Sequence, residues 1–268
     1  MPAWAAFVGL TTVVLVFLLA LARASQSLVT EREPSDQTVH DGGHAPAWGH
    51  DLADALRRDD APGPRDAADE FTTGLLLANV ALSQGFLGFV LVAGAWYFRI
   101  PLAALGVDLG DPLSTGLPAL GVGVALGLVL YVANAVGAAS ASAFGFEADE
   151  SLREMLTPDD ARGWTLLLGG VLPVIAGFEE LLFRAAVVGA TGAGFGLPLW
   201  GLALVSSLAF AAGHGAQGPA GIVVTGLLGF VLAAAFVLTN SLLAVFVAHY
   251  LVNALEFVVS GHFGLELG

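Results

Sequence analysis

Apolar residues fall in long blocks along this chain, and short polar or glycine-rich stretches separate one block from the next. A helix crosses the hydrocarbon core of a bilayer with about 20 apolar residues, a length that most of these blocks approach or exceed. The pattern therefore predicts an all-α fold, a polytopic transmembrane helical bundle. About seven spans are expected, at residues 2–22, 71–98, 117–139, 164–190, 197–213, 221–238 and 241–260.

The first block, residues 2–22, also has features of a signal peptide, because Ala22-Arg23-Ala24 is similar to a small-residue cleavage site. However, no positive residue precedes the apolar run, and the run is long for such a peptide. We therefore interpret residues 1–22 as a retained first transmembrane helix.

A strongly polar segment follows the first span. Residues 23–70 contain eleven of the 23 acidic residues and five of the nine arginines. We interpret this segment as an acidic, solvated loop, and residues 71–268 as the remainder of the bundle.

The composition indicates a membrane protein and excludes some kinds of site and partner. Only 12% of the residues are charged, about half of the share usual in a soluble domain. The chain has no cysteine, which excludes disulfides and cysteine–metal sites. The net charge of −14 and the absence of lysine leave no basic surface for nucleic acid. An acidic surface of this kind suits a halophilic source. Molar salt shortens the Debye length to about 3 Å, which screens the repulsion between the acidic side chains.

The arginines also predict an orientation. Five lie in the 23–70 loop and two lie in residues 140–163, whereas Arg99 is alone in the loop between them. Cytoplasmic loops carry an excess of positive residues. The two arginine-rich loops are therefore expected on the cytoplasmic side of a plasma membrane, with the N-terminus outside.

Three charged residues interrupt the apolar span 164–190, namely Glu179, Glu180 and Arg184. Glu179 lies 15 residues after Trp164, which is roughly 22 Å along a helix. Each charge at such a depth costs about 2.5–3.5 kcal/mol on insertion scales, so a function is the first hypothesis. The simpler alternative is a structural ion pair beside one protonated glutamate.

Helix geometry divides these three residues. Glu180 and Arg184 are four apart and lie on one face, where they can pair. Glu179 is rotated from them by about 100° and can point into a cavity. Pro173 has no N–H, so the carbonyl of Gly169 loses its helical partner. A kink at this point would open an intramembrane cavity beside Glu179.

The later spans add further polar residues to the same apolar region. His214 follows Phe210 by four residues at the end of one span, and His249 and Asn253 are four apart near the middle of the last. Together with Glu179, they supply a carboxylate base, imidazoles and an amide donor. Such a set is suited to hydrolysis.

Three motifs formed by these residues are similar to those of a known family. The chain has EExxxR at residues 179–184, FxxxH at 210–214 and HxxxN at 249–253. In this order on successive late helices, they resemble the CPBP intramembrane proteases, which include the CAAX prenyl endopeptidases and the bacteriocin-immunity (Abi) proteins. The resemblance covers about residues 115–260, which we take as a CPBP-like catalytic core.

The resemblance implies an intramembrane endopeptidase of the metalloprotease-like type. By analogy, Glu179 and His214 would activate a water, and His249 and Asn253 would stabilise the oxyanion. Glu179, His214 and His249 are also a possible Zn²⁺ ligand set, because catalytic zinc takes three protein ligands and a water. The HExxH spacing is absent, so a water activated by glutamate without a tightly bound metal remains open.

The remaining motif residues have supporting roles by the same analogy. Glu180 and Arg184 would hold the site together, and Phe210 would pack beside it. The implied partners are membrane lipid and a peptide or prenylated protein substrate, as in CAAX processing. The alternative is a non-enzymatic immunity or scaffold protein of the same family. A proton-coupled transporter fits less well, because the N-terminal spans contain no ionisable counterpart of the Glu179 cluster.

Dialysis against a chelator distinguishes a water bound to Zn²⁺ from a water that glutamate activates without a tightly bound metal. We expect chelators to inhibit proteolysis only weakly, as measured by cleavage after dialysis against a chelator. Complete loss of activity that Zn²⁺ restores would contradict this expectation.

Overall fold

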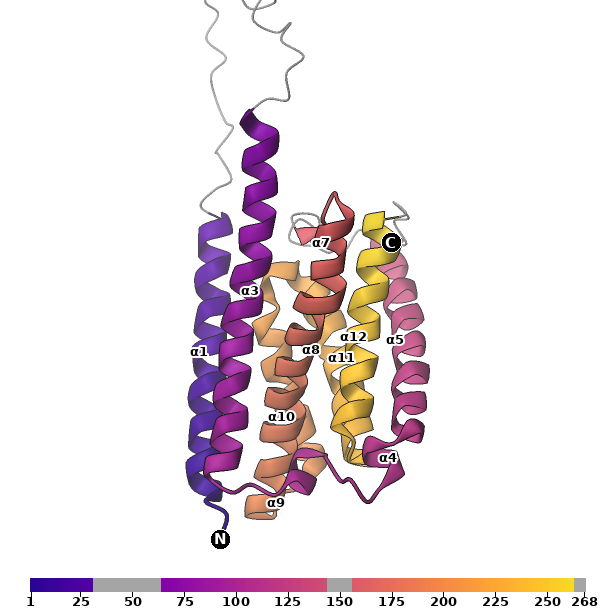
Figure 1. The fold of residues 1–268 in the computed structure, drawn as a ribbon. Coiled ribbons are helices and arrows are strands. Elements are labelled where there is room, and N and C mark those ends of the chain that lie inside the picture. Colours follow the sequence, from indigo (N-terminus) through magenta and orange to yellow (C-terminus); the bar gives the residue numbers. More distant parts are fainter. Residues whose placement is uncertain (31–63, 144–155, 263–268) are drawn as a thin grey trace, which may run out of the picture.

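The computed structural model describes residues 1–30, 64–143 and 156–262, and these residues form helices and the turns between them (Figure 1). No strand occurs among them. The predicted all-α transmembrane bundle is therefore confirmed. The predicted cavity beside Glu179 stays a prediction.

Six helical segments of the described chain are long and apolar enough to cross a membrane. A seventh, α10, is apolar but has only 15 residues, so the count agrees with the expected spans. Five crossings consist mainly of one helix each: α1 (Trp4–Thr30), α3 (Pro64–Tyr97), α5 (Leu117–Ala143), α11 (Gly218–Thr239) and α12 (Leu242–Glu256).

The other crossings and the connections contain shorter pieces. The fourth crossing is a continuous succession of α7 (Ala161–Leu166), η2 (Leu167–Val171), α8 (Leu172–Glu180), η3 (Leu181–Ala190) and α9 (Thr191–Phe195). It is followed by α10 (Leu199–Gly213). The connecting and terminal turns are η1 (Leu102–Leu105), α4 (Pro112–Thr115), η4 (Gly215–Gln217) and η5 (Phe257–His262).

The helices extend beyond the apolar blocks into the predicted 23–70 loop. α1 continues to Thr30 and α3 begins at Pro64, so both ends of this segment are helical. The apolar block marks where the bilayer lies, whereas a helix continues until a residue breaks its hydrogen bonds. Pro64 suits the first position of a helix. The N–H of a residue at that position would have no acceptor within the helix, so a proline there loses no hydrogen bond. Residues 31–63, the rest of the predicted loop, lie outside the described residues.

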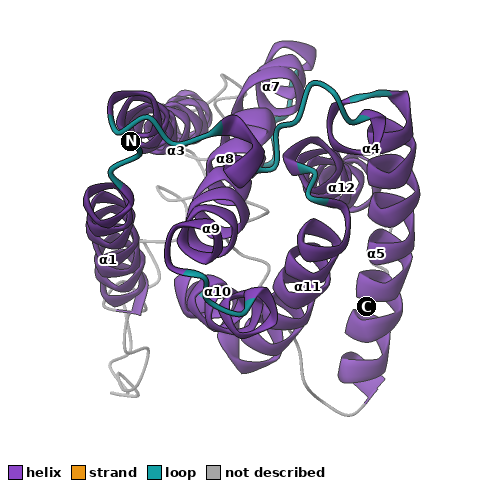
Figure 2. Cartoon of the chain, turned by 90° about the horizontal axis from the view of Figure 1, so that it is seen from below, coloured by secondary structure: helices purple, strands orange, loops and turns teal. Residues whose placement is uncertain are grey.

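The fourth crossing is the centre of the bundle. Half of its residues are buried, against 17–33% in the other five long crossings. Seen from below, α8 and α9 lie between α1 and α3 on one side and α11 and α12 on the other (Figure 2). Glu179, Glu180 and Arg184 of the fourth crossing are therefore buried among neighbouring helices.

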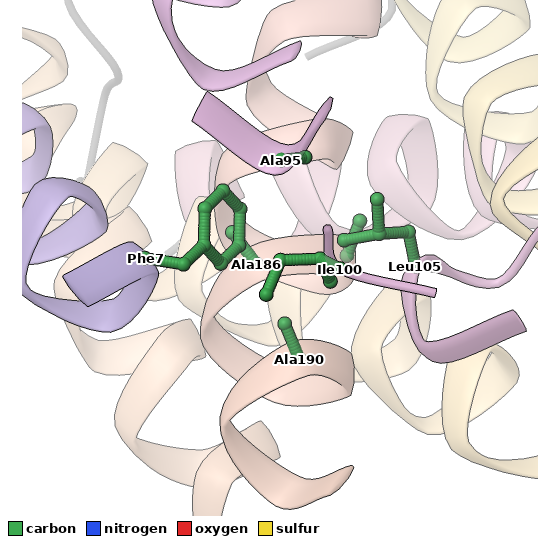
Figure 3. Close-up of a cluster of buried hydrophobic side chains, with 7 residues drawn as sticks. Phe7, Ala95, Ile100, Leu105, Ala186 and Ala190 are labelled. Carbon is green, nitrogen blue, oxygen red and sulfur yellow. The ribbon is translucent and has the colours of Figure 1, made fainter. Parts of the chain in front are cut away.

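The first span is part of this packing. The side chain of Phe7 on α1 is fully buried in a cluster with Ala186 and Ala190 of η3 and with Ile100 and Leu105 from the loop after α3 (Figure 3). Small side chains on η3 let the ring approach the central helix closely. α1 therefore contributes directly to the bundle core.

Two π-helical segments, η2 and η3, flank α8. A π-helix has hydrogen bonds between residues five apart instead of four, and it is frequent at functional sites. η2 ends two residues before Pro173. The kink expected at this proline stays a prediction. Across the end of η2, the N–H of Leu172 donates to the carbonyl of Leu167.

Glycines allow α5 and α12 to pack closely. A Cβ atom on Gly123 would lie 2.7 Å from the carbonyl oxygen of Ala244 and 2.8 Å from Cβ of Val247. One turn later, a Cβ on Gly127 would lie 2.9 Å from Cβ of Leu251. Gly123 and Gly127 therefore act as packing residues at the contact between the two helices.

This packing gives a first test within one helix. Gly123→Val should destabilise the protein by about 1–3 kcal/mol, the usual cost of overpacking. Gly121→Val is the matched control, because a Cβ on Gly121 meets no atom within 4 Å. Thermal unfolding in detergent micelles measures both, and equal shifts in the two variants would contradict the assignment.

Candidate active site

The buried carboxylate of Glu180 is shared by two donors from different helices. Its Oε1 lies 2.8 Å from Nη1 of Arg184, one turn further along the same crossing. The same oxygen lies 2.7 Å from Nδ1 of His249 on α12. Glu180 and Arg184 are fully buried, and His249 is 2% exposed. The ion pair expected from the four-residue spacing is therefore present, and it also holds an imidazole.

Arg184 has further contacts on α10 and α11. Its Nη2 donates to the carbonyl oxygen of Gly229 at 3.0 Å, and its guanidinium carbon lies 4.8 Å from the centroid of the Phe210 ring. A Cβ on Gly229 would lie 2.9 Å from Cδ1 of Phe210. The backbone of α11 can therefore approach the site because residue 229 has no side chain.

The sequence did not show this role of Gly229. The signal is weak because every residue has a backbone carbonyl, and only the fold shows which carbonyl a buried arginine reaches.

Glu179 approaches His249 from the other side. Its Oε2 lies 3.6 Å from Nε2 of His249, and the residue is 7% exposed. Two consecutive glutamates of the central crossing therefore face the two nitrogens of one imidazole. Arg184 contains only donors, so Oε1 of Glu180 acts as an acceptor and Nδ1 of His249 is the donor in their contact. In a neutral ring, Nε2 then carries the lone pair.

His214 lies at the end of α10, across the ring of Phe210. Its Nδ1 lies 2.8 Å from the carbonyl oxygen of Phe210, which can only accept, so Nδ1 is the donor. Nε2 is then the nitrogen that can take up a proton. The Phe210 ring centroid is 4.5 Å from that of His214 and 5.8 Å from that of His249. Phe210 therefore contacts both imidazoles.

Asn253 is half-buried on α12, one turn after His249. Within the described part of the chain, neither Asn253 nor His214 makes a hydrogen bond or ion pair with Glu179. The structure thus joins six of the seven predicted site residues by direct contacts and leaves Asn253 one turn from His249 on α12. The six are Glu179, Glu180, Arg184, Phe210, His214 and His249.

The same geometry tests the possible zinc ligands. Glu179 and His249 face one another, but His214 lies beyond Phe210. Among the residues that the structure describes, no group of three or more histidine, aspartate or glutamate side chains is placed to hold a metal ion. Glu179, His214 and His249 therefore do not fit a three-ligand zinc site in this arrangement.

The comparison with protein families agrees with the three motifs. Residues 161–255 match the family described as type II CAAX prenyl endopeptidase Rce1-like. This segment of the chain is Rce1-like. The resemblance to the CAAX proteases is therefore confirmed, and the Rce1-like segment runs from α7 to the end of α12 and includes all three motifs. No curated protein and no solved structure matches the chain.

The central ion pair of the Rce1-like segment gives a stability test. Arg184→Met should destabilise the protein by about 3–5 kcal/mol, because it leaves a buried carboxylate without its ionic partner. Arg162→Met is the control, since Arg162 is exposed at the start of the same crossing. Equilibrium unfolding in mixed micelles measures the difference. An equally small effect of both substitutions would contradict a structural role for Arg184.

Proposed function

We propose that this protein is an intramembrane endopeptidase that cleaves a peptide bond with a water activated by Glu179. The observation that carries the proposal is the position of Glu179, whose carboxylate faces Nε2 of a buried imidazole within the Rce1-like segment. A carboxylate and two histidines inside spans are costly and are expected to serve a function. The match of residues 161–255 to a family of prenyl endopeptidases suggests the class of that function.

The first step forms a carbon–oxygen bond. The water oxygen attacks the carbonyl carbon of the substrate, its proton passes to the Glu179 carboxylate, and the carbonyl electron pair becomes the oxyanion. The carbon–nitrogen bond then breaks, and a proton passes from Glu179 to the leaving amine. His214 assists at the water, because its Nδ1 is bound to the Phe210 carbonyl and Nε2 can accept a proton.

His249 and Asn253 are assigned to the oxyanion. Because Nδ1 of His249 donates to Glu180, a donor role toward an oxyanion requires a proton on Nε2 as well. Asn253 supplies a neutral amide donor from the next turn of α12. Donors of this kind contribute about 2.7–4 kcal/mol each to the transition state.

A prenylated C-terminus of the CAAX type is the proposed substrate, on the basis of the family match. We also propose that the end of the bundle where α1 ends and α3 begins faces the cytoplasm (Figure 1). Seven of the nine arginines lie in the predicted loops 23–70 and 140–163, and cytoplasmic loops carry an excess of positive residues.

Glu179→Ala tests the proposal directly. We expect it to lower the cleavage rate by about 10²- to 10⁴-fold, the usual contribution of a general base. The assay uses an internally quenched peptide that ends in a farnesylated CAAX sequence, with the protein in lipid nanodiscs. Asp159→Asn is the control, since Asp159 is exposed outside the site. Thermal unfolding shows whether both variants are folded.

A folded Glu179→Ala variant that still cleaves the peptide would contradict the proposed base. A non-enzymatic immunity or scaffold protein is the second candidate, favoured by the buried Glu180–Arg184 pair, which needs no substrate to explain it. Full biological activity of Glu179→Ala in cells, with no difference in the membrane peptides found by mass spectrometry, would support that candidate.

A further inference from the structure

We propose that the hydroxyl groups of Tyr250 and Ser206 position the catalytic helix α8 by binding backbone carbonyls in the two π-helical segments that flank it. The inference rests on the proposed function, because it assigns these residues to the orientation of Glu179 and Glu180. Ser206 lies outside the three motifs, and Tyr250 occupies a variable position within HxxxN.

Tyr250 binds the carbonyl that η2 leaves without a partner. In an α-helix, the carbonyl of Leu168 would accept from the N–H of Leu172, but that N–H donates to Leu167 across the end of η2. With π spacing, the donor to Leu168 would be Pro173, which has no N–H. The hydroxyl of Tyr250 donates to this oxygen at 3.0 Å.

The sequence points to the carbonyl of Gly169 as the one that Pro173 leaves without a helical partner, and the structure adds the carbonyl of Leu168. The π turn shifts the hydrogen-bond pattern by one residue, so Leu168 receives the donor from a neighbouring helix. A backbone carbonyl without a donor costs several kcal/mol in hydrocarbon, so the hydroxyl has a defined role.

Ser206 makes the corresponding contact on the other side of α8. Its hydroxyl donates to the carbonyl oxygen of Phe183 in η3 at 2.8 Å, and Ser206 is only 1% exposed. The adjacent Ser207 differs, because its hydroxyl donates to Ala203 on its own helix. Of these two serines, Ser206 is therefore the one that links α10 to the central crossing.

The two hydroxyls come from the helices that carry the histidines. Tyr250 is adjacent to His249 on α12, and Ser206 lies on the face of α10 that also carries Phe210 and His214 at four-residue intervals. α10 and α12, which position His214 and His249, are thus each linked to the fourth crossing by one of these hydroxyl hydrogen bonds. Glu179 and Glu180 lie between these two anchor points in the sequence.

The Tyr250 ring is itself held in place. It stacks on Phe246 with ring centroids 6.5 Å apart, and Phe246 packs against Gly177, two residues before Glu179. Removing the hydroxyl therefore leaves the ring in place and removes only the hydrogen bond.

The experiment compares two variants with two matched controls. Tyr250→Phe and Ser206→Ala each remove one anchoring hydroxyl. Tyr97→Phe removes an exposed one on α3, and Ser207→Ala removes a buried one that bonds its own helix. Amide hydrogen exchange over residues 167–190 is followed by mass spectrometry in nanodiscs, and cleavage of the farnesylated CAAX peptide is measured on the same samples.

We expect faster exchange in this segment for the two anchoring variants alone. Their kcat should fall by about 10- to 100-fold with KM unchanged, because a shift of about 1 Å in a catalytic group costs about 100-fold. Unchanged exchange, an unchanged kcat, or an equal loss in Ser207→Ala would overturn the proposal. A wild-type chain that does not cleave the peptide would contradict the proposed function, while amide exchange still tests the two anchors.

Discussion

The arrangement depends on the carboxylate of Glu180, which binds Arg184 and His249 through one oxygen. A charge inside the bilayer is tolerated when it is paired and hydrogen-bonded. Here the pairing draws three crossings together, because Arg184 also reaches the backbone of α11 at Gly229 and His249 lies on α12. The ion pair therefore orients the imidazole that Glu179 faces.

Membrane packing explains why the surrounding residues are small or hydroxylated. Helix association in lipid depends on close contact and on interhelical hydrogen bonds, since lipid is as apolar as the side chains. Gly123 and Gly127 provide the contact between α5 and α12, and Gly229 provides it at the site. These glycines allow the helices to approach closely. Glu180, Ser206 and Tyr250 form the hydrogen bonds between specific pairs of helices.

Much of the fold and part of the site were predictable from the sequence. Hydropathy located the crossings because a span needs a fixed number of apolar residues, and the i,i+4 spacing predicted the Glu180–Arg184 pair. The contact between His249 and both glutamates was not predictable, because it depends on how two distant helices pack. The π segments were missed as well, since hydropathy carries no information on whether a carbonyl pairs four or five residues ahead.

The π turn at Leu167–Val171 has a consequence for how this chain can vary in length. A π turn holds one more residue than an α turn, so it is equivalent to a one-residue insertion in the central crossing. Removing one residue there would restore the four-residue hydrogen-bond spacing as far as Pro173, which has no N–H to donate. The preceding part of the helix would change little in orientation, because the wide turn takes up the extra residue. The pattern that leaves the carbonyl of Leu168 to the hydroxyl of Tyr250 would be lost. The length of this segment therefore determines which backbone carbonyl needs a donor from α12.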